Sequence, residues 1–197
     1  ISEHEIVRGS AWLARAQRLL DEADLDCVER GWLLIPRGRQ LSESGDRLAA
    51  MAVFEEARAI GQRFADKDLI TMAGMGLGVC RVYTSGVRDG LAFLDEVMTA
   101  IEAGEVTPNI AGIVYCAVID ICQEVFDVRR ADEWTTSMTR WCDAQHEIVP
   151  FHGVCQVHRA QILQLRGDWS DAQTIAEEVA TKRAERAGPR AIGPAYY

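Results

Sequence analysis

Two stretches of the chain, "SGDRLAAMAVFEEA" at residues 44–57 and "RGDWSDAQTIAEEVA" at residues 166–180, share one pattern that decides the predicted fold. In each stretch a Gly-Asp pair is followed by small and large apolar residues at steps of three and four. Such steps place the apolar residues on one face of a helix. The two Gly-Asp pairs lie 122 residues apart. That interval is close to three periods of about 41 residues, which predicts a repeat.

The interval between the two stretches contains further copies of the same turn. The four turns begin at Ser44, Ser85, Phe126 and Arg166, so their separations are 41, 41 and 40 residues. An amphipathic segment follows each turn, and another helical segment precedes it, over residues 25–42, 68–84, 109–125 and 151–165. A single helix hairpin cannot bury its apolar face alone, whereas stacked hairpins share a continuous core. The sequence therefore predicts an all-α array of about four antiparallel helix hairpins.

The residues at the turns and between the helices agree with this array. Carboxylates that suit the start of a helix, and glycines that suit its left-handed end, stand at the turns, and Thr-Pro opens the third hairpin. These are Asp46, Asp127 and Asp168, then Gly45 and Gly167, and Thr107-Pro108. Small residues allow paired helices to approach closely, with Phe54 and Trp134 filling the space between them. The small residues are Gly38, Ala50, Ala57, Ala160 and Ala172.

Composition and charge narrow the class of protein. The 197 residues are 48% hydrophobic and 26% charged, which is ordinary for a soluble folded domain. The net charge of −9 repels nucleic acid, so direct DNA contact by this chain is not expected. No apolar run reaches the roughly 18–20 residues of a membrane span. The six cysteines form no C-x-x-C motif, which favours free, buried, reduced thiols in a cytoplasmic protein over a disulfide or a metal site.

The order of small, large and small residues after each Gly-Asp turn resembles tetratricopeptide-type (TPR-like) repeats. The match is best in residues 45–57 and 167–179 and weaker in the middle units, where Leu91 and Ala131 occupy the first small position. The period of about 41 residues is also longer than the usual 34 or so. The resemblance implies a right-handed superhelix, with extra helical turns or longer loops that accommodate the excess.

A narrower resemblance runs along nearly the whole chain. The strings "AWLARAQRLLDE" (11–22), "CVERGWLLIPRG" (27–38), "RRADEWTTSMTRWCDAQ" (129–145) and "HRAQILQLRGDW" (158–169) are similar to a pattern of actinobacterial LuxR-type, MalT-like regulators. The resemblance implies a cytoplasmic transcription regulator with a helix-turn-helix domain and often an upstream nucleotide-binding domain. The chain contains neither a P-loop motif nor a basic recognition helix. We expect residues 1–197 to be one TPR-like domain, a fragment of a longer protein that contacts DNA only through a downstream domain.

The inner-facing side of the first helix in each hairpin is the predicted binding face, because helical arrays usually bind partners on their concave surface. The candidate residues on this face are Trp32, Arg39, Cys80, Tyr83, Val114, Glu124, Val157 and Gln161. The expected partner is a protein, a peptide or a small-molecule effector. No cofactor is expected.

Motifs that suggest a phosphate, metal, redox or catalytic site receive less support than the helical array. The glycines of "AGMGLGVC" (73–80) match neither common phosphate-binding fingerprint and indicate close helix packing. His152, Cys155 and His158 lie three apart on a helix, as metal ligands can, but packing in the hairpin is favoured and no metal is predicted.

Cys116, Cys122 and Cys142 show no neighbour that obviously lowers a thiol pKa, which argues against a redox sensor. No nucleophile elbow or paired-carboxylate motif is present, so a non-enzyme is predicted.

These observations predict a non-catalytic, effector-sensing repeat domain of a LuxR-type regulator. In this mechanism ligand binding shifts the orientation of the repeats and thereby the availability of distant domains. The alternative is a stand-alone TPR adaptor or oligomerisation module, and self-association as a homodimer is expected where the array exposes apolar ends. A catalytic or metal-dependent domain is a third alternative.

Overall fold

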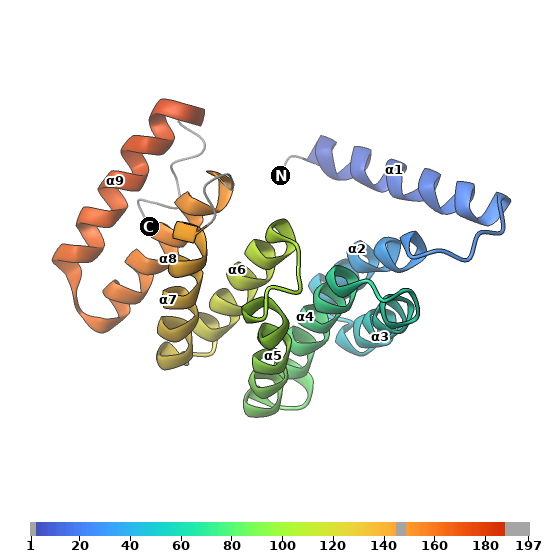
Figure 1. The fold of residues 1–197 in the computed structure, drawn as a ribbon, viewed down its shortest axis with the longest axis horizontal. Coiled ribbons are helices and arrows are strands. Elements are labelled where there is room, and N and C mark those ends of the chain that lie inside the picture. The colour runs from blue at the N-terminus through green and yellow to red at the C-terminus, as the bar shows by residue number, and fades with distance from the viewer. Residues whose placement is uncertain (1–2, 145–148, 188–197) are drawn as a thin grey trace. The chain divides into compact units, whose positions relative to one another are not determined.

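The computed structural model describes residues 3–144 and 149–187, with side chains at residue 9, residues 11–144 and residues 156–181. Every regular element in these ranges is an α-helix, and no strand occurs among them. The prediction of an all-α protein is therefore confirmed (Figure 1). None of the described helices combines the length and the apolar character that a membrane crossing requires.

The chain divides into two compact units, Ile1–Val106 and Thr107–Tyr197. The first unit contains α1 (Glu3–Glu22), α2 (Glu29–Glu43), α3 (Arg47–Phe64), α4 (Lys67–Thr84) and α5 (Val87–Glu102). The second contains α6 (Pro108–Glu124), α7 (Val128–Ala144), α8 (Val149–Arg166) and α9 (Trp169–Ala187). The prediction that residues 1–197 form one continuous array concerns the relation between these units and stays a prediction.

The turns inside the hairpins lie where the repeat predicts them. Each contains one residue with positive φ: Gly45 at 91°, Gly86 at 112°, Phe126 at 60° and Gly167 at 88°. This left-handed conformation ends the first helix of each hairpin and favours glycine, because a Cβ atom is disfavoured there. The predicted roles of Gly45 and Gly167 are confirmed. Phe126 takes the same conformation without being a glycine, and its side chain is exposed.

Helix starts follow the predicted capping residues in part. The Asp46 carboxylate accepts a hydrogen bond from the Ala49 backbone N–H at 3.2 Å, and Asp127 accepts one from Arg130 N–H at 3.1 Å. Such caps satisfy backbone donors that the first helical turn leaves without partners. Thr107 and Pro108 occupy the predicted positions before and at the start of α6.

The helix that the sequence predicts over residues 25–42 begins later in the structure. The helix α2 begins at Glu29, and Asp24 upstream has φ of 46°. The Arg30 guanidinium donates to the backbone carbonyl of Leu20 at 2.8 Å and pairs with Asp21 at 2.8 Å. These bonds give a partner to a carbonyl group at the end of α1, and they hold the connection between α1 and α2 in a non-helical conformation.

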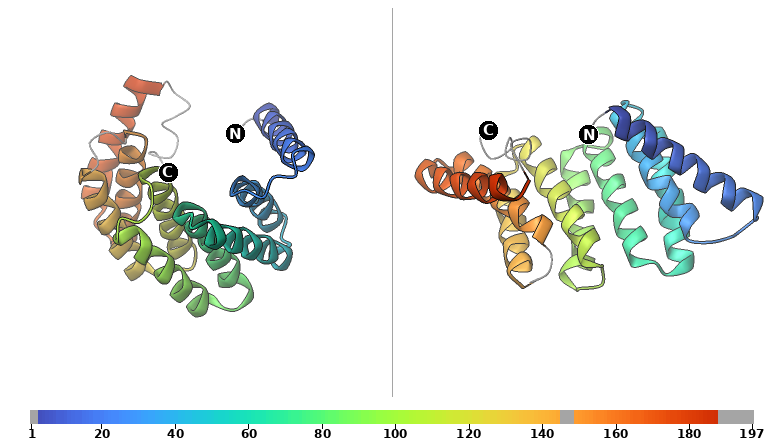
Figure 2. Two further views of the ribbon diagram at one scale, coloured as in Figure 1. Left: turned by 45° about the vertical axis from the view of Figure 1, so that its right-hand side comes forward. Right: turned by 90° about the horizontal axis from the view of Figure 1, so that it is seen from above.

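Helices that follow one another pack together within each unit. In the first unit α2 packs on α3, α3 on α4 and α4 on α5, and α2 also contacts α4. In the second unit α6 packs on α7, α7 on α8 and α8 on α9, and α6 also contacts α8. The first helices of successive hairpins are thus neighbours in both units (Figure 2). This arrangement is helical-repeat-like, because within each unit one hairpin packs on the hairpin that follows it.

The space between the first two hairpins is filled by one aromatic ring. Phe54 on α3 is only 4% exposed, and its ring lies against Gly38 of α2 and Gly76 of α4. An added Cβ would lie 2.6 Å from the ring at Gly38 and 2.5 Å from it at Gly76. The predicted role of Phe54 is confirmed. Trp134, its proposed counterpart, is half-buried on α7.

The glycines of residues 73–80 serve packing, as the sequence indicates. They lie inside α4, where Gly74 faces Val97 and Gly78 faces Leu94 of α5. An added Cβ at Gly78 would lie 2.4 Å from the Leu94 side chain. Glycine is therefore needed here because α5 and Phe54 approach the α4 backbone closely.

Replacing Gly90 of α5 by alanine should destabilise the first unit. The new Cβ would lie 2.4 Å from the backbone nitrogen of Val82, which cannot move without separating α4 from α5. We expect overpacking to lower the free energy of unfolding by about 1–3 kcal/mol, after the gain of ~1 kcal/mol in helix propensity is included. Urea denaturation followed by circular dichroism measures this loss.

The matched control is Gly9→Ala on α1, where nothing lies within 4 Å of the added atom. Its helix propensity improves without a clash, so its stability should be unchanged or slightly higher. If Gly90→Ala is as stable as the unchanged protein, the close approach of α4 and α5 is contradicted.

Candidate functional site

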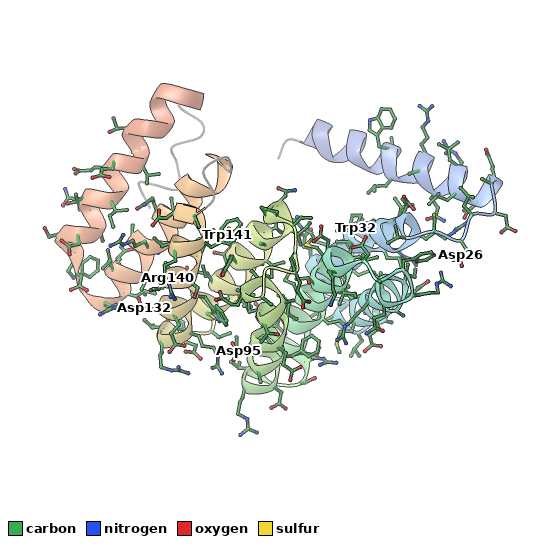
Figure 3. The ribbon with its side chains drawn as sticks, in the orientation of Figure 1. Asp26, Trp32, Asp95, Asp132, Arg140 and Trp141 are labelled. Carbon is green, nitrogen blue, oxygen red and sulfur yellow. The ribbon has the colours of Figure 1, made fainter. Side chains whose placement is uncertain are left out.

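The four predicted site residues of the first unit occupy different environments. Trp32 is half-buried on α2 (Figure 3), and its indole N–H donates to the Asp66 carboxylate at 3.2 Å. Arg39 is exposed on α2 and Tyr83 is exposed near the end of α4, so both can reach a ligand. Cys80 is 0% exposed and packs with Phe54 in the core. The structure corrects the expectation for Cys80, because a fully buried side chain cannot line a binding surface.

The two accessible residues of this unit already have charged neighbours. The Arg39 guanidinium pairs with Glu43 at 2.7 Å, one helical turn further along α2. The Arg47 guanidinium lies 4.4 Å from the centre of the Tyr83 ring, a cation–π contact.

The predicted residues of the second unit divide in the same way. Val114 on α6 is 0% exposed, so this candidate is also corrected: it belongs to the core. Val157 on α8 is half-buried against Val179 and Ala180. Glu124 is exposed at the end of α6, and Gln161 is half-buried on α8. Their role in binding stays a prediction.

Gln161 belongs to a polar cluster that joins the two first helices of this unit. Its side-chain oxygen accepts a hydrogen bond from Gln123 Nε2 at 3.5 Å and lies 3.3 Å from His158 Nδ1. The same His158 nitrogen lies 3.7 Å from the Asp120 carboxylate. Cys116 lies one turn before Asp120 on the same face of α6. We call Cys116, Asp120, Gln123, His158 and Gln161 the α6–α8 polar cluster.

His158 is the most enclosed polar member of this cluster. The residue is 4% exposed, and its Nε2 atom is buried without a hydrogen-bond partner. A buried polar atom without a partner is unfavourable, because it loses its hydrogen bonds to water and gains none. The nitrogen is closed to solvent, so its missing hydrogen bond is a cost of packing His158 in the protein interior.

Burial controls the protonation of the cluster. Burial lowers the pKa of His158, although the Asp120 carboxylate and the hydrogen bond to Gln161 act in the opposite direction. Burial raises the pKa of Asp120, opposed by His158. Because 66% of the Asp120 side-chain surface remains accessible, solvent screens its carboxylate, and His158 dominates the pH response. The imidazole is therefore neutral near neutral pH.

The Cys116 thiol of the polar cluster has little nucleophilic character. Burial, with a smaller contribution from Asp120, raises the pKa of Cys116 to about 12, so its thiol stays protonated near neutral pH. Cys27, Cys80, Cys116 and Cys122 are free thiols, as predicted. Cys142 is disulfide-bonded, which corrects the expectation that every cysteine is reduced.

No group of three or more histidine, cysteine or acidic side chains that could hold a metal occurs among the residues described. Of the considered ligand set, His152 and Cys155 fall outside the described side chains.

A hollow lies in the first unit, between α1, α2 and α3. Its volume is about 510 Å³, and its lining mixes leucine and isoleucine side chains with polar groups such as Arg30, Gln40 and Glu56. The adjoining helix α1 packs on α2 and exposes Trp12 and Leu19 to solvent.

Sequence reasoning placed Gln161 on the binding face and favoured a packed His158, which is buried, but it missed their partner Asp120. The available signal was the position of Asp120, which ends the apolar run "IAGIVYCAVI" and lies on the same helical face as Cys116. His158 stands in an otherwise apolar face of α8, a pattern that also fits a buried core histidine. The contact between α6 and α8 depends on the tertiary structure, so the spacing of residues in the sequence does not show that these side chains meet.

Comparison with models of known protein families finds no match to this chain, and comparison with curated protein sequences finds none either.

Mutation of His158 should change how stability depends on pH. The unfolded histidine takes up a proton near its ordinary pKa of 6.5, whereas the folded one does so only at lower pH. The folded state therefore loses stability as the pH falls through this window. Between about pH 7.5 and about pH 5.5, the unchanged protein should lose more unfolding free energy than His158→Gln.

The second variant is Asp120→Asn, which removes the carboxylate that favours the charged imidazole. It should lose at least as much stability on acidification as the unchanged protein. Urea midpoints across the pH series measure both effects. Identical pH profiles for His158→Gln and the unchanged protein would show that this histidine is not held neutral by burial.

Proposed function

We propose that this chain is a non-catalytic, effector-sensing repeat domain that binds its ligand on the face formed by the first helices. The observation that carries this proposal is the α6–α8 polar cluster, in which the exposed Asp120 carboxylate and the half-buried Gln161 amide lie beside each other around His158. It lies between two first helices, which is the face that helical arrays use for binding. Exposed Glu124 and half-buried Gln161 on these helices supply polar groups for recognition.

The family part of the proposal comes from sequence resemblance. We propose that the chain is a TPR-like right-handed segment of a cytoplasmic LuxR-type regulator whose DNA contacts are made by a downstream helix-turn-helix domain. The net charge of −9 supports this division, because an acidic surface repels phosphate backbones. The ligand is a protein, a peptide or a small-molecule effector, and binding changes the packing between hairpins.

A ligand that binds this face should lose affinity when the polar cluster is altered. We expect a member of a panel of sugars, amino acids and short peptides to raise the melting temperature, since binding to the native state stabilises it by about 2.7 kcal/mol at a hundredfold excess over Kd. Gln161→Ala and Glu124→Ala should reduce the shift. Differential scanning fluorimetry measures it.

The control is Gln173→Ala, which changes an exposed glutamine on α9 that bonds only Glu177 of its own helix. It should leave the ligand-induced shift intact. Fluorescence anisotropy with labelled duplexes tests the other half of the proposal. Tight, sequence-specific DNA binding by this chain at physiological salt would refute the division of labour.

The structure also offers an observation in favour of the alternative, a stand-alone adaptor or oligomerisation module. Trp12 is 62% exposed and Leu19 is 55% exposed. They lie seven residues apart and so share one face of α1. Large apolar side chains exposed on one helical face are typical of protein–protein contact surfaces.

If α1 mediates self-association, replacing both Trp12 and Leu19 by serine should shift the protein toward the monomer, because the buried apolar area is lost. Analytical ultracentrifugation over a concentration series measures the association. Leu48→Ser, at a 73% exposed leucine on α3, is the control and should have no effect. An unchanged protein that is monomeric at every concentration would exclude self-association through α1.

A further inference from the structure

A groove of about 320 Å³ lies between α7 and α8 in the second unit and is unlike the rest of this acidic chain. It is lined by Asp132, Thr135, Thr136, Thr139 and Arg140 from α7, and by Arg159, Ile162, Leu163 and Arg166 from α8. We call it the α7–α8 groove. Figure 3 labels two of its polar side chains, Asp132 and Arg140. The lining holds three arginines and one carboxylate.

One end of the groove is closed by an ion pair. The Arg166 guanidinium lies 3.1 Å from the Asp132 carboxylate, and its Nε lies 3.8 Å from Asp168. This contact also sets the register of the two antiparallel helices. At 1.5 Å per residue, Arg159 on α8 and Arg140 on α7 each lie about 10–12 Å along their helix from this ion pair. These two arginines therefore lie at the same level, at the other end of the groove.

Arg140 and Arg159 are the charges that this groove leaves open. Neither pairs with a carboxylate anywhere in the described chain, and the polar contact that Arg140 makes is to the Ser137 hydroxyl at 3.2 Å. Two guanidinium groups facing one groove repel each other unless an anion lies between them. A guanidinium fork matches the oxygens of phosphate and carboxylate groups.

The floor of the groove supplies a hydroxyl group without a partner. Thr135 is 4% exposed, and its Oγ1 atom is buried with no hydrogen-bond partner. One turn further along α7, Thr139 donates to the Thr135 carbonyl at 2.8 Å. An unpaired buried hydroxyl is unfavourable. Because Thr135 lines the groove, an anion seated there offers the acceptor that its hydroxyl lacks after a rotation about χ1.

We propose that the α7–α8 groove binds a phosphate group, either as the free ion or as the monoester group of a small molecule. Three arginines and one aspartate give the lining a net charge of +2. A phosphate monoester carries close to two negative charges near neutral pH, so the charges balance. At physiological ionic strength the rest of the acidic surface is screened beyond about 8 Å, which leaves the groove to act locally.

This site is distinct from the α6–α8 polar cluster and goes beyond the function proposed above. It lies between a second helix and the first helix of the next hairpin, whereas the polar cluster joins two first helices. A phosphate bound there bridges α7 and α8, and so ties successive hairpins together.

Isothermal titration calorimetry of the unchanged chain tests the proposal with three probes: inorganic phosphate, phenyl phosphate and acetate. We expect both phosphate compounds to bind and acetate to bind much more weakly. Tighter binding of phenyl phosphate identifies a monoester ligand, and tighter binding of inorganic phosphate identifies the free ion. Equal binding of acetate would overturn the proposal, as would the failure of both phosphate compounds to bind.

Variants locate the site. Arg140→Gln and Arg159→Gln should each weaken phosphate binding by about tenfold or more, because each removes a charge-assisted hydrogen bond. Thr135→Val, which keeps the side-chain shape, should weaken it less. The control is Arg129→Gln on the same helix, which removes the same charge from an arginine that pairs with Glu133 outside the groove.

Circular dichroism of every variant checks that the helices remain folded. Arg129→Gln should change the affinity by less than about twofold. If it weakens binding as much as Arg140→Gln does, the phosphate senses diffuse charge and the groove is not the site. If Arg140→Gln fails to fold, Arg159→Gln and Thr135→Val carry the test.

Discussion

The contact of one phenylalanine ring with two glycines is the constraint on which the first unit depends. Phe54 projects from α3 against Gly38 of α2 and Gly76 of α4, and neither position has room for a Cβ. Three helices are thereby packed around one side chain, and the two first helices are brought into contact. Because protein interiors are close-packed, a larger residue at either glycine must displace the ring or separate the helices.

Packing of this kind also determines where polar groups can be placed. Once α6 and α8 are neighbours, polar residues on their facing sides lie close together and away from water, as His158 and Gln161 do. The groove between α7 and α8 differs, because its arginines keep their charge and remain accessible while Thr135 is buried beneath them. The same helical stacking thus produces a polar cluster with one carboxylate on one side of α8 and a cationic groove on another.

Much of the architecture was predictable because local patterns and tertiary packing agree. The 41-residue spacing of the turns predicted hairpins whose left-handed residues include Gly45 and Gly167, and the glycines of residues 73–80 were correctly assigned to close packing. Two kinds of error remain. Cys80 and Val114 were placed on the binding face but lie in the core, because a helical face is wide and its periodicity does not separate a buried flank from an exposed one. The start of α2 was placed four residues too early, because the Arg30 contacts that define it involve α1.

The amino-acid sequence by itself determined the helical hairpins, their period, the turn residues and the acidic charge, since these follow from local backbone preferences and from the spacing of apolar side chains. Only the tertiary structure decided which polar side chains come together. Asp120 and His158 are far apart in sequence and become neighbours through helix stacking, and Arg140 and Arg159 come to line one groove. Burial then changes the chemistry of His158 and Thr135, because loss of water alters the cost of charge and of an unpaired hydrogen-bonding group, and no local pattern encodes that loss.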